Sequence, residues 1–184
     1  MKFTLDSNCI IALEERRPEA LPIRMLVDRH SENGIDVALI AMMASERPRL
    51  AEAETSFSEF QSRIEDLGLG HLPHVLPLCY WGISFWDHCL WADDAEVLEE
   101  QIHAVLFPNR PFRGDGVAAS ERFESWRNAK CDVQAMWSHI HAARDVFVTN
   151  DANFHKATKL PQLLSLGAGR IIRPMDIPEL LKQL

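Results

Sequence analysis

Two short apolar runs with helical sequence between them limit the folds open to this chain. The first run covers residues 3–5, and the second, at residues 35–41, is rich in β-branched side chains. Residues 7–15 and 21–33 have the pattern of helices, and Gly34 is positioned to end the second one. A strand, a helix and a second strand in this order imply a right-handed crossover and a parallel sheet. The sequence therefore predicts an α/β fold.

The same alternation continues toward the C-terminus. The expected helices are residues 50–67, 95–106, 117–129, 132–143 and 178–184, and the expected strands are residues 75–79, 146–149 and 170–172. We find no internal repeat and no linker that would divide the chain. A length of 184 residues is also enough for one sizeable core. We therefore expect a single domain over residues 1–184.

Composition narrows the possible functions and locations. The net charge of −8 argues against nucleic-acid binding through bulk charge, but it permits a local basic groove or a carboxylate-rich metal site. The cysteines have no paired spacing and are expected to be buried thiols of a reducing cytosol: Cys9, Cys79, Cys89 and Cys131. The longest apolar run, residues 37–44, is too short to cross a bilayer, and no signal peptide is predicted. We expect a cytoplasmic protein that does not enter membranes.

Carboxylates recur where the predicted strands end. Asp6, Glu46 and Asp151 each follow a different strand, and Asp132 is predicted to begin the helix that leads to the last of them. If gathered at one edge of a parallel sheet, these groups would repel one another unless a cation neutralised them. Oxygen ligands of this kind suit Mg²⁺ or Mn²⁺, which can activate water for attack on a phosphodiester. The pattern indicates a metal-dependent phosphodiester hydrolase.

Each of these acids also has a purely structural interpretation. Asp6 and Asp132 could cap the helices that follow them and do nothing more. The proline at position 48 makes the backbone near Glu46 unusual. Because Asp6 and Asp151 have the same setting, we favour metal ligation for the set. Asp145, by contrast, is interpreted as a helix-end or turn residue.

Three stretches resemble the PIN domain family, and in particular VapC-type ribonucleases. They are FTLDSNCII near the start, ALIAMMASE at the second strand, and CDVQAMWSHIHAARDVFVTNDANF near the end. The family has a strand that ends in Asp followed by Ser or Thr and often Asn, which Asp6, Ser7 and Asn8 match. Its Thr-x-Asp-x-x-Phe segment is matched from Thr149 through Asp151. Glu46 and Asp132 match the two remaining acids of the family.

This resemblance implies a three-layer α/β/α fold and Mg²⁺- or Mn²⁺-dependent endoribonuclease activity. It also implies a possible small antitoxin partner and a homodimer. Asn8 and Asn150 would act as neutral partners of the acids, and Thr149 could donate a hydrogen bond to a ligand carboxylate. The resemblance is weak over residues 68–126, which we interpret as a divergent, mainly helical insertion.

Candidate substrate contacts are less specific. Arg127, Asn128 and Lys130 could face a phosphate backbone or could form a solvated helix end. The tryptophans of residues 81–111 are interpreted as packing anchors rather than as base-stacking platforms.

Two other functions are compatible with parts of the sequence. A haloacid-dehalogenase-like phosphatase also begins with a strand that ends in Asp, but it needs a second Asp two residues later, where this chain has Asn8. A PIN scaffold without catalysis, kept for RNA or protein binding, is the other alternative. The apparently complete set of acids favours the nuclease.

Overall fold

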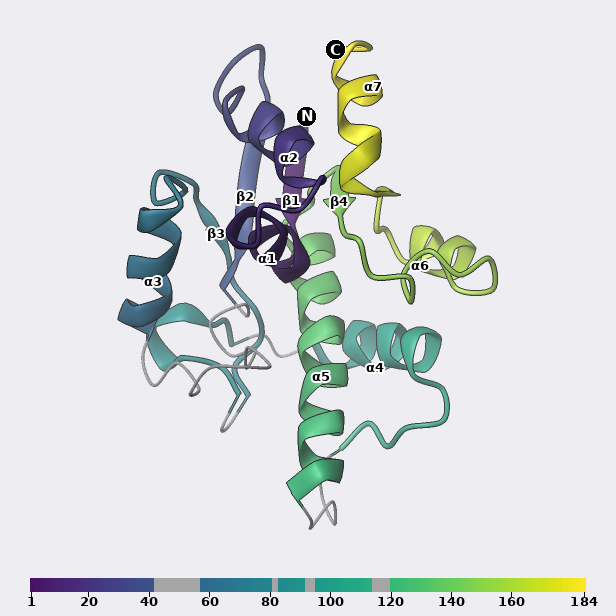
Figure 1. Cartoon of the computed structure of the whole chain (residues 1–184). Coiled ribbons are helices and arrows are strands. Elements are labelled where there is room, and N and C mark those ends of the chain that lie inside the picture. Colours follow the sequence, from purple (N-terminus) through teal and green to yellow (C-terminus); the bar gives the residue numbers. More distant parts are fainter. Residues whose placement is uncertain (42–56, 81–82, 92–94, 114–119) are drawn as a thin grey trace.

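The described residues form an α/β fold around five parallel strands. The computed structural model describes residues 1–41, 57–80, 83–91, 95–113 and 120–184. The strands are β1 (Lys2–Leu5), β2 (Asp36–Ile40), β3 (His74–Val75), β4 (Val146–Val148) and β5 (Arg170–Ile172). They lie in the order β3-β2-β1-β4-β5, with every neighbouring pair parallel (Figure 1). The predicted α/β class and parallel sheet are confirmed.

The central strands are buried on both faces, which explains their nearly continuous apolar sequences. Phe3 and Leu5 of β1 and all three residues of β4 are fully buried. In the register of the sheet, Leu5 lies between Leu39 of β2 and Val148 of β4. Parallel sheets covered by helices have such continuous apolar strands rather than alternating ones.

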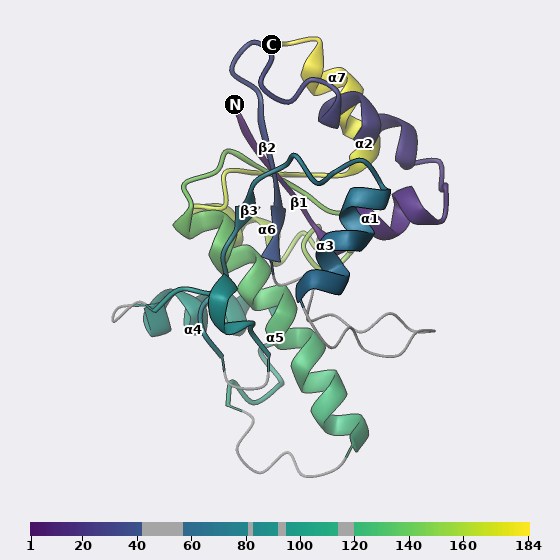
Figure 2. The same ribbon diagram turned by 90° about the vertical axis from the view of Figure 1, so that its left-hand side faces the viewer.

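Helices cover the sheet from both sides (Figure 2). They are α1 (Ser7–Glu14), α2 (Ala20–Val27), α3 (Phe57–Asp66), α4 (Ala95–Leu106), α5 (Ser120–His141), α6 (Leu160–Ser165) and α7 (Ile177–Leu181). Two short 3₁₀ turns are η2 (Trp86–His88) and η3 (Pro174–Asp176). In Figure 2, α1, α2 and α7 lie on one side of the strands, and α4 and α5 lie on the other. The N-terminal half of α5 extends past the edge of the sheet where β1 ends (Figure 1).

Most predicted elements agree with the structure. The bounds of α4 and β5 match the predicted ranges, whereas α2 ends at Val27, several residues before the predicted end. The turn after α2 explains this difference, because Ser31 and Asn33 have positive φ angles and the ring of His30 accepts a hydrogen bond from the backbone N–H of Val37. The short helix α6 was not predicted.

The two predicted helices at residues 117–129 and 132–143 correspond to one continuous helix, α5, over residues 120–141, and residues 117–119 lie outside the described residues. The prediction that a helix begins at Asp132 is wrong, because Asp132 lies well inside α5. Residues 120–141 contain no proline or glycine, and nothing local interrupts the helix. Residues 129–131 are buried, and Gln134 and Lys130 contact Glu99 of α4. Packing against α4 therefore continues through the segment where the sequence suggested a break.

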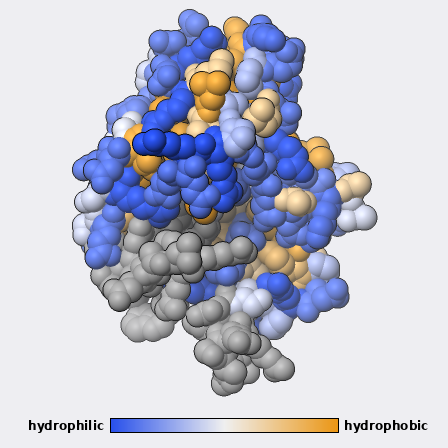
Figure 3. Space-filling view, viewed as in Figure 1, coloured by the Kyte–Doolittle hydropathy of each residue, from blue (hydrophilic) through white to orange (hydrophobic). Residues whose placement is uncertain are grey.

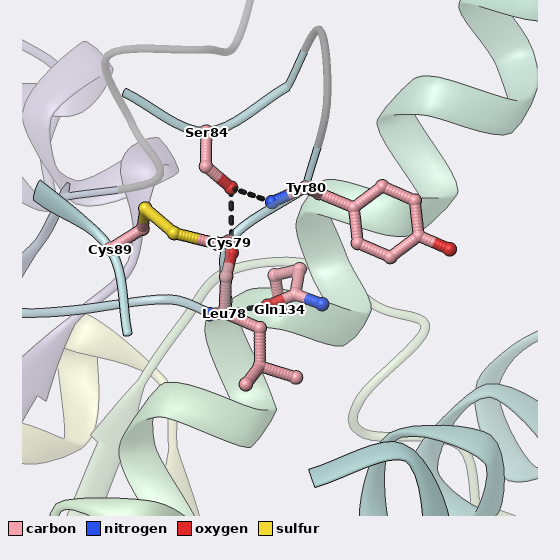
Figure 4. Close-up of a disulfide and its surroundings, with 6 residues drawn as sticks. All are labelled: Leu78, Cys79, Tyr80, Ser84, Cys89 and Gln134. Carbon is pink, nitrogen blue, oxygen red and sulfur yellow. Dashed lines mark hydrogen bonds between the residues drawn. A yellow bond between two sulfur atoms is a disulfide. The ribbon is translucent and has the colours of Figure 1, made fainter. Parts of the chain in front are cut away.

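A disulfide corrects the prediction for two of the cysteines. Cys79 and Cys89 are bonded and close a loop that follows β3 (Figure 4). Ser84 Oγ stabilises the same loop, since it donates to Leu78 O and accepts from the backbone N–H of Tyr80, at 2.6 and 3.0 Å. Cys9 and Cys131 are buried, as predicted. Cysteine pairing depends on the distance between chain segments, which sequence spacing alone did not indicate.

The surface seen in Figure 3 is mostly hydrophilic, with apolar residues in scattered patches. Within the described ranges, no helix has the length and apolar character that a membrane crossing requires. The predicted insertion at residues 68–126 supplies the edge strand β3 as well as α4. Whether the chain folds as one domain remains a prediction.

Candidate functional site

Two of the predicted acids lie at the point where the strand order reverses. Asp6 directly follows β1, and Asp151 follows β4, its neighbour in the sheet. The chain leaves β1 toward β2 on one side and leaves β4 toward β5 on the other. In open α/β sheets, ligands bind in the crevice that this divergence leaves at the carboxyl ends of the strands. The topology therefore selects the same pair of acids as the sequence.

Asp6 is a buried carboxylate and the N-cap of α1. Its Oδ1 accepts a 2.8 Å hydrogen bond from the backbone N–H of Ser7, and its side chain is 5% exposed. The helix-cap interpretation is therefore correct. It does not exclude a second role, because Oδ2 points to a different set of partners.

Thr149 and Asn8 connect the end of β1 to the end of β4. The Thr149 hydroxyl donates to Asp6 Oδ2 at 2.6 Å and accepts from Asn8 Nδ2 at 2.8 Å and from the backbone N–H of Asp151 at 3.0 Å. Asn8 Nδ2 also donates to Asp6 Oδ2, and Asn8 Oδ1 accepts from the backbone N–H of Asn150. These bonds fix the orientation of the Asp6 carboxylate relative to the backbone that carries Asp151.

Asp151 has an acceptor oxygen that remains available. Its Oδ1 accepts from the backbone N–H of Asn153 at 2.8 Å. In the described part of the chain, Oδ2 has no hydrogen-bond partner. Asp151 is half-buried.

Burial raises the pKa of Asp6 to about 6, with a smaller contribution from the nearby carboxylate of Asp151. Hydrogen bonds from Thr149 and Ser7 oppose the rise in this pKa because they stabilise the charged form. Burial raises the pKa of the neighbouring Cys9 thiol as well, so that it stays protonated. Asp6 is thus a carboxylate whose charge is costly without a positive partner.

Sequence reasoning missed Glu19, which also contacts this network. Glu19 Oε1 accepts from Asn150 Nδ2 at 2.8 Å, and its charge contributes to the raised pKa of Cys9. It lies in the turn before α2, outside any strand end. No pattern in the sequence distinguishes it from an ordinary surface glutamate.

Of the remaining predicted residues, the structure describes the positions of some and not of others. Glu46 lies outside the described residues, so its position relative to Asp6 remains a prediction. Asp132 is half-buried on α5, the helix whose His139 reaches Thr4 of β1 at 2.8 Å. Asp145 contacts the backbone N–H of Lys2 at the opposite edge of the sheet, in agreement with its interpretation as a turn residue.

The predicted substrate contacts do not form a basic surface. Asn128 is exposed and Arg127 is half-buried, but Lys130 is fully buried, 2.6 Å from Glu99 and beneath the rings of Tyr80 and Phe112. Lys130 therefore cannot face a phosphate backbone, and this part of the prediction is wrong. Its aliphatic stem and charge belong to the packing between α4 and α5.

No family model, curated protein or solved structure matches this chain.

The donor chemistry of the site fits a hard divalent cation. The candidate ligands are carboxylate and neutral oxygens, which Mg²⁺ and Mn²⁺ prefer. Among the residues that the structure describes, no group of three or more His, Cys, Asp and Glu side chains is arranged to hold a metal ion. The described candidate ligands are the pair Asp6 and Asp151, and the charge of Asp151 contributes to the raised pKa of Asp6.

Proposed function

We propose that this chain is a divalent-metal-dependent endoribonuclease with a PIN-like three-layer fold. The observation that carries the proposal is the pair Asp6 and Asp151, which meet at the reversal of strand order and are joined through Thr149 and Asn8. The resemblance of the strand-end stretches to PIN domains supports RNA as the substrate. A small antitoxin and a homodimer are further expectations from the same resemblance.

In this proposal, some of the described residues would bind the metal ion and others would orient the residues that bind it. Asp6 and Asp151 would hold Mg²⁺ or Mn²⁺, and Glu46 and Asp132 remain the predicted additional ligands. A bound ion would lower the pKa of a water molecule and stabilise the developing charge on the phosphate oxygens. Thr149 and Asn8 would keep Asp6 oriented, since both donate to its Oδ2. Burial of Asp6 would limit competing contact with bulk water.

The phosphatase alternative gains no support from these contacts. Such an enzyme needs a proton-carrying acid two residues after the first Asp, and Asn8 is an amide. Both polar atoms of the Asn8 side chain are occupied, by Asp6 and Thr149 on one side and by the backbone of Asn150 on the other. Asn8 is therefore a positioning residue in this proposal.

RNA cleavage by matched variants tests the proposal. Asp6→Asn and Asp151→Asn should each reduce Mn²⁺-dependent cleavage of single-stranded RNA by about 100-fold or more, because even residues that only orient metal ligands contribute about 10- to 100-fold. Asp28→Asn is the control, since it removes an exposed carboxylate at the end of α2. Circular dichroism would establish that all variants fold.

Cleavage that persists in Asp6→Asn, or that continues in the presence of a chelator, would rule out this site as the catalytic centre. RNA binding without cleavage in either metal would instead support a non-catalytic scaffold.

A further inference from the structure

Three cations lie in the region of Asp151. They are Arg110, after α4, and Lys156 and Lys159, before α6; together we call them the basic cluster. Arg110 and Lys156 are exposed, and Lys159 is half-buried. Within the described ranges, none of the three forms an ion pair with an Asp or Glu side chain.

The ring of Phe107 holds two of these cations near each other. Lys159 Nζ lies 5.8 Å from the centre of this ring, and the guanidinium carbon of Arg110 lies 5.2 Å from it. Arg110 is also held by a 2.8 Å hydrogen bond from Nη1 to Ser125 O on α5. Lys156 lies one helical turn before Lys159, whose backbone N–H donates to Lys156 O. The cluster is therefore built on the end of α4 and the turn before α6.

Two hydrogen bonds connect the cluster to the acid pair. Lys159 Nζ donates to Asn153 Oδ1 at 2.5 Å, and the backbone N–H of Asn153 donates to Asp151 Oδ1 at 2.8 Å. Lys159 Nζ also donates to Leu106 O, the last residue of α4. An ammonium group has three protons, and two of them have acceptors among the described residues, which leaves one donor for a ligand there.

The charges in this region act on one another. Partial burial lowers the pKa of Lys159, and the nearby charges of Lys156 and Arg110 lower it further, whereas Asp151 has the opposite effect. Within the described residues, the charges that act on Lys159 are thus those of two other cations and of one carboxylate, Asp151. An anion placed beside Asp151 would reduce the repulsion within the cluster.

We propose that Arg110, Lys156 and Lys159 bind the phosphate backbone of a single-stranded RNA next to the bond that is cleaved. This inference rests on the proposed function, since it assigns the binding path of the same substrate. Phosphate oxygens suit the exposed guanidinium and ammonium groups. Lys159 also positions Asn153, so Arg110 and Lys156 are the members whose contribution to binding can be tested separately.

Anisotropy of a short, fluorescein-labelled single-stranded RNA measures this binding. The experiment uses the full chain with Asp6→Asn, in Mg²⁺, so that RNA is not cleaved. Adding Arg110→Gln and Lys156→Gln should weaken binding by about tenfold or more. It should also reduce the slope of log K against log salt by about 1.4, because each phosphate contact on a single strand contributes about 0.7. The control pair, Lys2→Gln and Arg29→Gln, removes the same charge from exposed positions elsewhere and should preserve both values.

A charge-conserving pair, Arg110→Lys and Lys156→Arg, should retain the salt slope of the parent. The proposal is overturned if the Gln pair behaves like the control pair, or if the parent chain does not bind RNA. Loss of binding in the Gln pair, together with an unmodified chain that does not cleave RNA, would retain the basic cluster and reject the nuclease. Metal-dependent RNA cleavage by the unmodified chain, together with unchanged RNA binding in the Gln pair, would retain the nuclease and reject the basic cluster as the RNA-binding site.

Discussion

Asp6 combines a structural role with the properties of a ligand. It caps α1 through the backbone N–H of Ser7, yet it is buried beside a second carboxylate, and its pKa is raised to about 6. A cap alone would be equally effective at an exposed position, where its charge is not penalised. Capping therefore does not explain why this carboxylate is buried, and a bound cation is the explanation that we propose.

The raised pKa of Asp6 predicts a specific pH dependence of stability. The folded protein binds a proton at Asp6 more tightly than the unfolded chain does, so this group lowers the free energy of unfolding as pH rises from about 4 to about 6. In Asp6→Asn this loss of stability should be absent. The unfolding free energy of metal-free Asp6→Asn, measured relative to the metal-free parent, should therefore be about 1 to 3 kcal/mol higher at pH 7 than at pH 4. Urea unfolding at both values of pH measures this difference.

His139 changes the free energy of unfolding over the same range of pH, but in the opposite direction. The effect of Asp6 is therefore obtained by comparing Asp6→Asn with the parent at each pH. Burial lowers the pKa of His139 to about 4, and its contribution to stability is lost as pH falls below about 6.5. This effect is common to the parent and to Asp6→Asn. If the difference in unfolding free energy between the parent and Asp6→Asn does not change with pH, folding does not raise the pKa of Asp6.

At the level of elements, α4 and α5 are joined by a buried ion pair. Lys130 of α5 and Glu99 of α4 are both almost inaccessible, and Gln134 Nε2 also donates to Glu99. Burial lowers the pKa of Lys130, while the charge of Glu99 opposes this. The pair therefore connects the two helices, and the last residue of α4, Leu106, accepts a hydrogen bond from Lys159 of the basic cluster.

Removing Lys130 alone should lower the free energy of unfolding far more than removing the charges of both Lys130 and Glu99. Lys130→Met would leave Glu99 buried without a cation and should destabilise the fold by about 3 to 5 kcal/mol. Lys130→Met combined with Glu99→Gln should recover most of this loss, because the amide oxygen introduced by the second substitution can still accept from Gln134. Urea unfolding followed by circular dichroism compares the two variants. Equal stability of the single and double variants would show that the charges are not coupled.

At the scale of the whole molecule, the Cys79–Cys89 loop links distant elements. His88 stacks on Phe57 of α3 with ring centres 3.5 Å apart. On the other side, Leu78 N donates to Gln134 Oε1 of α5 at 2.9 Å, beside the disulfide (Figure 4). The loop thus joins α3, near the β3 edge, to the long helix that covers the opposite face of the sheet.

Opening the disulfide should lower stability without removing the acid site. Closing a loop of this length contributes about 2 to 3 kcal/mol through the entropy of the unfolded chain. Reduction with a phosphine should therefore lower the free energy of unfolding by about that amount. The pair Cys79→Ser and Cys89→Ser should show the same loss and no further response to reductant. An unfolding curve that reductant leaves unchanged would mean that the two thiols are not bonded in solution.

Local patterns were sufficient to predict β1, β2, β4, β5 and α4, and they placed Asp6 and Asp151 at strand ends of one parallel sheet, whereas β3 shares only Val75 with the predicted range 75–79. Burial between helices makes a strand apolar, and parallel strands share a carboxyl edge, so these features are present in the sequence itself. The resemblance to PIN domains and the identity of Glu46 and Asp132 as ligands remain predictions. Mg²⁺ or Mn²⁺ and RNA likewise remain proposals.

Only the tertiary structure decided which residues meet across long stretches of chain. The sequence alone suggested a break before Asp132, free thiols at Cys79 and Cys89, and an accessible Lys130. In the structure, the helix is continuous through Asp132 and Lys130 is buried, because α4 packs on α5, and Cys79 and Cys89 are bonded to each other. The basic cluster likewise exists because α4 ends beside the turn before α6. Such contacts depend on the three-dimensional path of the chain, which residue spacing does not specify.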